Sequence, residues 1–495
     1  MSAPRAKTKG DGLTAGVLAA VFGGLYGLTL CRTVYWYDSA ELVTAAVTLG
    51  ITHPPGYPLY TLLAHGLTWL PIEPALAVNL MSAVFGAAAV ALVFAVGRQL
   101  GLERPAAALG AAVLGTGRVF WSNAVVAEVY TPAVAAAALV LLLLLRGADE
   151  HRFELSLLGA WLAGLSLGLH MSIATLGLGF AWLVWVNGRR IGRLIAAAGA
   201  AALGSLIFLY IPLRSARNPA LNICDPSTPA QLAWYLSGGA YRHWFGADSG
   251  GLLERGAALG GALSDQLGWA GIALSLVGIA WLSRQRTEAC LALVLMAAGN
   301  LAFFFRYRAH DVEVFLLPTT MLLCCFAGAG AQALWSQIGR AVKPGRAKAA
   351  RAVVAGALFL LPLRLGYASY QSADMSRFDE TESFVRAMEQ TLPQDAVILN
   401  FTTPPEWKRY AVFGMYDQLV RERRRDVTHV IAPDLRKLAR DFDPQDAIYL
   451  YAPVEMLDYF FETQPEGPLI RVLGPKPDAA VRAPRKTKKG RTCWN

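Results

Sequence analysis

The sequence predicts a mainly α-helical protein that crosses a membrane about eleven times and carries a small C-terminal α/β domain. Of its 495 residues, 55% are hydrophobic and only 16% are charged, whereas an ordinary soluble domain has about 25% charged residues. The apolar residues form long runs, and a run of about 18 or more is long enough to cross a bilayer as a helix. Most of the chain is therefore expected to lie in lipid.

Eleven apolar segments have the character of membrane spans. They cover residues 13–31, 76–97, 105–120, 130–145, 155–169, 172–186, 194–212, 267–283, 288–305, 314–335 and 351–367. The first lacks a convincing cleavage site, so we expect an uncleaved helix rather than a signal peptide. Lys and Arg concentrate in alternate loops, and by the positive-inside rule these loops and the N-terminus are expected to be cytoplasmic. We expect the membrane to be the inner (plasma) membrane of the cell.

This orientation places three polar segments on the non-cytoplasmic side. They are the loops 32–75 and 213–266 and everything after about residue 368. The last segment alternates helical periodicity with short β-branched runs, which is typical of a small α/β domain. We therefore divide the chain into a transmembrane domain (1–370), an α/β domain (371–480) and a basic tail (481–495). The α/β domain has no Gly-rich strand-to-helix turn, so we expect no nucleotide site there.

Charge and cysteine content exclude several classes of protein. The net charge is +10, but the basic residues form short clusters between apolar runs and in the tail, so orientation in the membrane explains them better than nucleic-acid binding. The six cysteines show no CxxC pattern. We therefore expect no disulfide framework and no structural zinc site.

The loop 32–75 contains the most informative residues. Asp38 and Glu41 lie three residues apart at the start of a helical stretch, which puts both carboxylates on one face. This spacing fits a capping box as well as a catalytic pair. The following THPPGYP fixes the backbone around His53 and Tyr57, which suits either a rigid substrate-positioning loop or an interfacial turn.

A second group of candidates lies at residues 210–245. Arg214 and Arg217 emerge where a helix leaves the membrane, a place that suits either phosphate binding or a snorkelling anchor. Hydrogen-bonding and stacking groups of the sort that hold sugars or headgroups follow at Asn222, Asp225, Tyr241 and Arg242.

Ionisable residues also interrupt apolar sequence at the expected outer ends of other helices. They are Glu128, His170, His310 and Asp311. Such groups are costly beside a span unless they are paired or line a cavity, which raises the expectation of a functional role. The histidines show no metal-ligand spacing such as HxxxH, so we expect no metal site among them and no cofactor besides a lipid-linked sugar substrate, while a metal requirement stays open.

Several motifs resemble the bacterial branch of the membrane protein O-mannosyltransferase family, in the GT-C glycosyltransferase superfamily. They are DSAEL and LGITHPPGYPLY in the first outside loop, followed by VNLMSAVFGA, FWSNAVVAEVY, GLSLGLHMS, YIPLR and HDVEVFLLP in order. The resemblance covers most of residues 13–370. It implies a GT-C type fold and transfer of a sugar, mannose or another hexose, from a polyprenyl-phosphate donor to a protein or envelope acceptor, with inversion.

The resemblance also implies roles for individual residues. Asp38 matches the family's acidic residue in the first outside loop and would be the base for the acceptor hydroxyl, with Glu41 beside it. Arg214, with Arg217 or His53, would hold the donor phosphate. The remaining candidates would shape the substrate pocket: Tyr57, Glu128, His170, Asn222, Asp225, Tyr241, Arg242, His310 and Asp311.

Two other classes of function fit the same sequence. A transporter or flippase of a lipid-linked or envelope precursor would also have many spans, but it should carry charges or helix breaks near the middle of several of them. A non-catalytic envelope assembly protein would use the α/β domain to bind a partner. The position of most ionisable groups at one membrane face favours interfacial chemistry.

Overall fold

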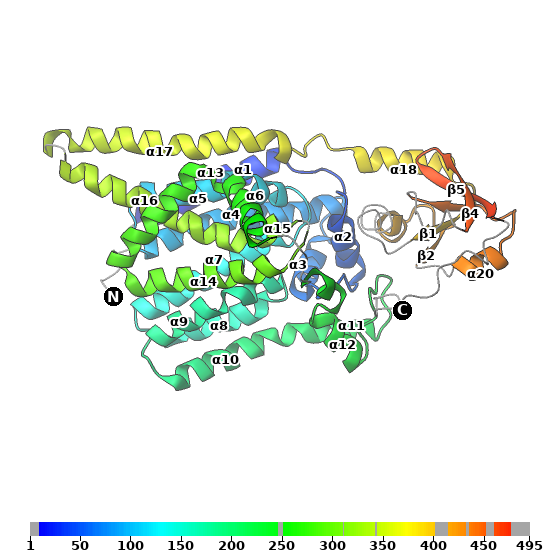
Figure 1. Ribbon diagram of the computed structural model, residues 1–495, viewed down its shortest axis with the longest axis horizontal. Helices are drawn as coiled ribbons and strands as arrows, with labels where there is room; N and C mark the ends of the chain where they lie inside the picture. The colour runs from blue at the N-terminus through cyan, green and yellow to red at the C-terminus, as the bar shows by residue number, and fades with distance from the viewer. Residues whose placement is uncertain are drawn as a thin grey trace.

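The chain forms a bundle of helices with a small sheet beyond one end of it (Figure 1). The computed structural model describes residues 9–245, 251–309, 311–341, 344–400, 414–431, 435–451 and 460–476. The candidate His310 and the predicted tail 481–495 lie outside these ranges. A mainly α-helical fold with a C-terminal sheet confirms the predicted class.

The first half of the chain supplies most of the bundle. Its helices are α1 (Lys9–Leu28), α2 (Asp38–Thr48), α3 (Pro58–Leu67), α4 (Pro74–Gln99), α5 (Arg104–Thr116), α6 (Arg118–Ala124), α7 (Tyr130–Asp149), α8 (Phe153–Ser166), η1 (Met171–Leu176), α9 (Gly177–Val186), α10 (Ile191–Ser205), η2 (Leu206–Leu209), α11 (Tyr210–Ser215), α12 (Pro229–Leu236) and η3 (Gly239–Phe245).

The second half adds long helices and then the sheet. These elements are α13 (Leu252–Gln285), α14 (Thr287–Arg306), α15 (Val312–Phe315), α16 (Leu317–Ala341), α17 (Pro344–Ala373), α18 (Glu380–Thr391), β1 (Val397–Asn400), β2 (Thr428–Ile431), α20 (Leu435–Arg440), β3 (Ile448–Leu450), β4 (Phe461–Glu466) and β5 (Leu469–Pro475). The sheet order is β2-β1-β3-β5-β4, with β1 parallel to both its neighbours and β5 antiparallel to both of its own.

The chain is a multi-pass membrane protein. Within the described ranges, 8 helices are long and apolar enough to cross a membrane. The predicted spans 155–169 and 172–186 correspond to shorter apolar helices, and the span 105–120 is divided into α5 and α6 at Gly117. Helix α13 begins at Leu252, well before the predicted span at 267. It consists of two parts that meet at a kink at Gly268, and the predicted span corresponds to the second part.

Glycines allow the spans to pack with their backbones in close contact. A Cβ on Gly164 of α8 would lie 1.8 Å from the carbonyl oxygen of Ala201 in α10, and one on Gly278 of α13 would lie 1.8 Å from that of Phe326 in α16. Small residues are a common means of helix association in lipid, where no hydrophobic force drives helices together. Substituting these glycines would push the helices apart.

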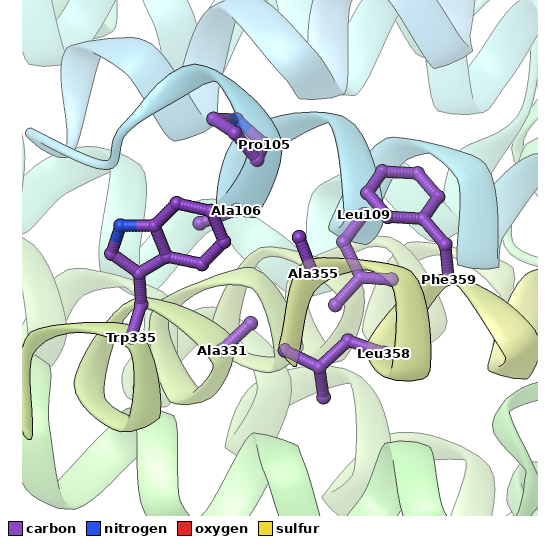
Figure 2. Close-up of a pocket in the computed structure, with 8 residues that line it drawn as sticks. All are labelled: Pro105, Ala106, Leu109, Ala331, Trp335, Ala355, Leu358 and Phe359. Atoms are coloured by element: carbon purple, nitrogen blue, oxygen red, sulfur yellow. The ribbon is translucent and has the colours of Figure 1, made fainter. Parts of the chain in front are cut away.

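The predicted site residues lie away from the pocket that the bundle contains between its long helices. Figure 2 shows an apolar pocket between α5, α16 and α17, lined by residues such as Leu109, Trp335 and Phe359. The short helices α2, α3, α11 and α12 lie at the end of the bundle on the side of the sheet (Figure 1). The polar candidates gather at this end.

Candidate functional site

Helix α2 begins directly at Asp38. The residue before it, Tyr37, occupies the N-cap position with a positive φ of 59°, and its side chain makes no capping hydrogen bond. The capping-box interpretation of Asp38 and Glu41 is therefore wrong. Asp38 is left with a side chain that is 25% exposed, whereas Glu41, one turn further on, is fully buried.

Glu41 orients His53 through two short hydrogen bonds. Its Oε1 lies 2.6 Å from the backbone nitrogen of His53 and 2.8 Å from Nδ1 of the same residue. An ionised carboxylate only accepts hydrogen bonds, so Nδ1 carries a proton and donates it to Glu41. This arrangement fixes both the tautomer and the direction of the imidazole ring.

The other ring nitrogen of His53 faces Tyr57 and Asp38. Tyr57 Oη is 2.8 Å from His53 Nε2, and Asp38 Oδ2 is 3.8 Å from it. Burial raises the pKa of Tyr57 well above its ordinary value, and Tyr130, Tyr241, Asp38 and Glu41 raise it further. Tyr57 therefore stays protonated and donates to Nε2. The result is a hydrogen-bonded chain from Glu41 through His53 to Tyr57, with Asp38 beside it.

The loop that carries His53 is fixed by the segment after α11. Ile51 donates its N–H to Leu221 and accepts from Ile223 through its carbonyl group. Tyr235 Oη donates to the carbonyl oxygen of Thr52 at 2.6 Å. Gly56 has a positive φ of 81°, and a Cβ there would lie 2.9 Å from Tyr235 Oη. The glycine of HPPGYP is thus required both by the turn and by the closeness of Tyr235.

Arg214 is bound to the backbone rather than held open for a ligand. Its Nε lies 2.7 Å from the carbonyl oxygen of Leu49 and its Nη2 lies 2.9 Å from that of Thr48. These carbonyls end α2, where a cation is favourable. The geometry favours a helix-capping role, and phosphate binding by Arg214 stays a prediction. Arg217 is exposed beyond the end of α11.

Aromatic rings form a wall next to His53, which we call the aromatic wall: Tyr57, Tyr130, His170 and Phe315. The His170 ring stacks on Tyr57 with centroids 5.9 Å apart and contacts the rings of Tyr130 and Phe315. Its Nδ1 accepts hydrogen bonds from the N–H and hydroxyl group of Ser172. Burial, with a smaller contribution from His53, lowers the pKa of His170 to about 3. His170 is therefore a neutral part of the wall at neutral pH.

Two further carboxylates lie near the aromatic wall. Glu128, which is half-buried, and Asp311, which precedes α15, both act electrostatically on Tyr130, as does Asp38. Long-range charge effects do not fix which side chains line the site. Substrate binding by Glu128 and Asp311 stays a prediction.

The remaining candidates lie in local contacts of their own. Asn222 and Asp225 both bond the hydroxyl group of Ser215, with O···O distances of 3.0 and 2.9 Å. Arg242 is exposed and donates to Ser237. Tyr241 stacks on Trp244 with centroids 5.0 Å apart. Substrate binding by these residues stays a prediction.

One disulfide departs from the expectation of no disulfide framework. Cys224 is disulfide-bonded, whereas Cys31, Cys290, Cys324 and Cys325 are free and buried. The sequence could not indicate this bond, because neither a repeat nor a CxxC spacing marks it. A disulfide in the loop 213–266 fits an oxidising, non-cytoplasmic compartment.

Asp38, Glu41 and His53 are close enough to hold a metal ion, since one ligand atom from each lies within 4.8 Å of the others. The hydrogen bonds of His53 oppose this interpretation. Nδ1 donates to Glu41 and Nε2 accepts from Tyr57, so a metal would have to displace one of them. The contacts favour hydrogen bonding over coordination.

Sequence reasoning missed the contacts that hold this region in place. Tyr235 contacts the loop of His53 from 183 residues away, and no motif marks it. Phe315 and Ser172 lie within the motifs HDVEVFLLP and GLSLGLHMS, but nothing in the spacing singled them out from their neighbours. Ser215 bonds Asn222 and Asp225 through its hydroxyl group, a contact that no local pattern indicates.

Comparison with known proteins confirms the family resemblance. Residues 38–193 match the model of the "Protein O-mannosyl-transferase TMEM260 N-terminal domain". The chain is 27% identical over 422 residues to the Mus musculus "Protein O-mannosyl-transferase TMEM260". That alignment covers 77% of this chain and 58% of the mouse protein, so the chain spans less than two thirds of its relative.

The fold is also that of a solved bacterial protein. The crystal structure of ArnT from Cupriavidus metallidurans bound to undecaprenyl phosphate aligns with a TM-score of 0.61 at 13% identity, covering 97% of this chain and 100% of ArnT. The apo state of the same protein aligns with the same TM-score and identity over 95% of this chain and 99% of ArnT. This likeness confirms the GT-C type fold implied by the resemblance.

Proposed function

We propose that this protein is a membrane glycosyltransferase that moves a sugar, mannose or another hexose, from a polyprenyl-phosphate carrier to a hydroxyl group of a protein or envelope acceptor. The chain shares motifs with an O-mannosyltransferase and a fold with a protein that binds undecaprenyl phosphate. The observation that carries the proposal is a partly exposed Asp38 carboxylate 3.8 Å from an oriented His53.

Asp38 is the general base in this proposal. The acceptor oxygen forms a bond to the anomeric carbon while the bond from that carbon to the phosphate oxygen breaks. The acceptor proton passes to Asp38, and the lipid phosphate leaves with the bonding electrons. Attack opposite the leaving phosphate inverts the anomeric carbon. A positioned base of this kind typically contributes about 10²–10⁴-fold to the rate.

In this proposal His53 and Glu41 order the wall of the site beside Asp38 rather than contact the donor phosphate. Buried Glu41 fixes the imidazole ring, and Nε2 accepts from Tyr57 while lying 3.8 Å from Asp38 Oδ2, so the proton of the acceptor hydroxyl passes to Asp38 and not to a shared hydrogen bond with His53. A buried carboxylate behind a histidine is a common way to fix its orientation. Glu41 therefore acts through His53, while the aromatic wall closes one side of the site.

The reaction is proposed to take place on the non-cytoplasmic face of the plasma membrane. The distribution of Lys and Arg supports this orientation, and the disulfide at Cys224 agrees with it. The site lies at one end of the bundle, where a lipid-borne phosphate at the membrane surface has access. A flippase would instead need polar groups along the middle of its spans.

The decisive experiment compares wild type with Asp38→Asn. The purified protein is reconstituted with polyprenyl-phosphate mannose and an envelope-protein extract, and transfer of labelled sugar is measured. We expect transfer by wild type and a loss of about 100-fold or more in the variant. Asp265→Asn, which changes a carboxylate that is 58% exposed, is the control and should remain active.

Two outcomes would overturn parts of this proposal. If wild type transfers no sugar from mannose or other hexose donors, the enzymatic function is wrong. If Asp38→Asn keeps full activity, the base is another residue. A chelator, EDTA, added to the same assay should leave the rate unchanged, because His53 is already engaged by Glu41 and Tyr57; metal-dependent transfer would argue for coordination instead.

A further inference from the structure

Arg421 stands at the centre of a polar cluster that joins the C-terminal region to the first outside loop. We call this cluster the junction: Thr33, Glu73, Glu382, Tyr416 and Arg421. Arg421 Nη2 lies 2.5 Å from Glu382 Oε1, 3.2 Å from Thr33 Oγ1 and 3.4 Å from Glu73 Oε1. Thr33 also bonds Glu382, and Tyr416 bonds Glu73.

The junction is shielded from solvent. The side chain of Arg421 is only 14% exposed and that of Glu382 only 23%, and the guanidinium lies over the Tyr416 ring at 5.2 Å. Burial raises the pKa of Glu382, but the hydrogen bonds from Arg421 and Thr33 and the charge of Arg421 outweigh it, so the pKa is lowered overall. Breaking one partner of such a pair is costly, because the other charge stays buried.

The C-terminal region also bonds the rest of the segment that leads to Asp38. Met375 donates its N–H to the carbonyl oxygen of Thr29 at 2.9 Å. Thr381 Oγ1 donates to the carbonyl oxygen of Val34 at 2.8 Å. Trp36 Nε1 donates to Glu380 Oε2 at 3.1 Å.

Ring contacts add to these bonds. The Tyr35 ring packs on Phe378 with centroids 4.9 Å apart, and Trp36 packs edge-on against Phe384 at 5.8 Å. The segment is thus contacted at Thr29 and at each residue from Thr33 to Trp36 by described residues of the C-terminal region. Tyr37, the last residue before Asp38, has a positive φ of 59°, a conformation that costs free energy unless its surroundings impose it.

We propose that Arg421 and Glu382 are positioning residues that hold the start of α2, and with it Asp38, in place for the reaction. The proposal rests on the proposed function for its catalytic consequence. The C-terminal region contacts residues 29–36 on one side of Tyr37, and Asp38 follows on the other. A displacement of about 1 Å at a reacting group can cost about 100-fold in rate, so a loosened junction should act on turnover.

The first test follows backbone hydrogen exchange of residues 39–46 in the full-length protein. Arg421→Gln should raise exchange of these amides several-fold, because the junction no longer fixes the segment before α2. Arg423→Gln is the matched control. The Arg423 side chain is 47% exposed, and its Nη1 lies 3.9 Å from Glu389 Oε1, which is too far for a hydrogen bond. Unchanged exchange in Arg421→Gln would overturn the proposal whether or not the protein transfers sugar.

The second test measures kcat and donor KM in the reconstituted transfer assay. Arg421→Gln and Glu382→Gln should each lower kcat at least tenfold with donor KM within twofold of wild type, and Arg421→Lys should restore part of the loss. The double variant should lose less than the product of the two single losses, since both changes remove the same ion pair. An unchanged kcat in an active enzyme would refute positioning, as would a rise in donor KM without a fall in kcat. A wild type without transfer activity refutes the proposed function alone.

Discussion

At the level of single residues, the site contains two carboxylates with different environments. Glu41 is fully buried and bonded to His53, whereas Asp38 is partly exposed beside Nε2 of the same ring. Their separation of three residues gave no sign of this difference, because both lie on one helix face. This difference supports the proposal that the exposed carboxylate reacts and the buried one orients His53.

Substitutions of Glu41 separate orientation from packing. Glu41→Gln keeps the shape and one acceptor oxygen, so we expect near-normal thermal stability but at least tenfold lower kcat, since the neutral amide holds the proton on Nδ1 less strongly. Glu41→Leu leaves the N–H and Nδ1–H of His53 without an acceptor, which costs about 1–3 kcal/mol. Thermal unfolding and kcat of the two variants check this. Equal kcat in Glu41→Gln and wild type would contradict the orienting role.

Asp417 is a second buried carboxylate, in the C-terminal region. Burial raises its pKa to about 6, although Arg421 and Arg423 oppose this, and among the described residues neither of its oxygens has a hydrogen-bond partner. The folded protein therefore holds a proton that the unfolded chain releases near pH 4. The favourable contribution of this proton to the free energy of unfolding is complete below about pH 4 and is lost as the pH rises through about 6.

Asp417→Asn should therefore stabilise the protein at neutral pH. The amide removes the cost of the buried charge, so Tm at pH 7.5 should rise by about 2 °C or more, with little change at pH 4. Asp446→Asn, at an exposed position, should leave Tm unchanged at both pH values. A lower Tm for Asp417→Asn at pH 7.5 would show that the carboxylate has a favourable partner.

At the level of elements, α2 depends on contacts at both of its ends. It has only 11 residues, and isolated helices of this length are marginal in water. The C-terminal region fixes the segment before it, and Arg214 binds the carbonyls of Thr48 and Leu49 at its end. Helix α2 is thus held by segments that follow it by more than 150 residues in the chain.

Arg214→Gln tests whether this arginine caps α2 or binds the donor. Loss of a charged hydrogen bond to carbonyls at a helix end should cost about 1–2 kcal/mol, so Tm and kcat should fall together with donor KM little changed. Arg217→Gln is the comparison, because its side chain is exposed. A large rise in donor KM for Arg214→Gln at unchanged Tm would restore its predicted role as a phosphate ligand.

For the whole molecule, the sequence predicted the helical class, the order of the spans and the C-terminal sheet. Hydropathy and β-branched runs are local signals, and each segment carries its own. The site was only partly predictable, because its geometry depends on contacts between distant segments. Asp38, His53 and Tyr57 come together as expected, whereas the roles of Arg214 and Glu41 and the existence of the junction depended on partners that no spacing indicates.

The orientation of the molecule makes a final prediction. The loop 32–75 and α18 contact each other through Thr381, Glu382 and Glu380, so both must face the same side of the membrane. Arg217→Cys and Arg386→Cys introduce exposed thiols beyond α11 and in α18, and Arg189→Cys introduces one between α9 and α10.

A membrane-impermeant maleimide applied to intact cells should label residues 217 and 386 but reach residue 189 only after permeabilisation. The free cysteines among the described residues are buried, so background labelling from them should be low. Labelling of residue 189 alone would invert the topology and place Asp38 in the cytoplasm, while labelling of only one of 217 and 386 would contradict the contacts between the first outside loop and the C-terminal region. Agreement at all three positions would put Asp38, the aromatic wall and the junction together on the face where a polyprenyl-phosphate donor is proposed to react.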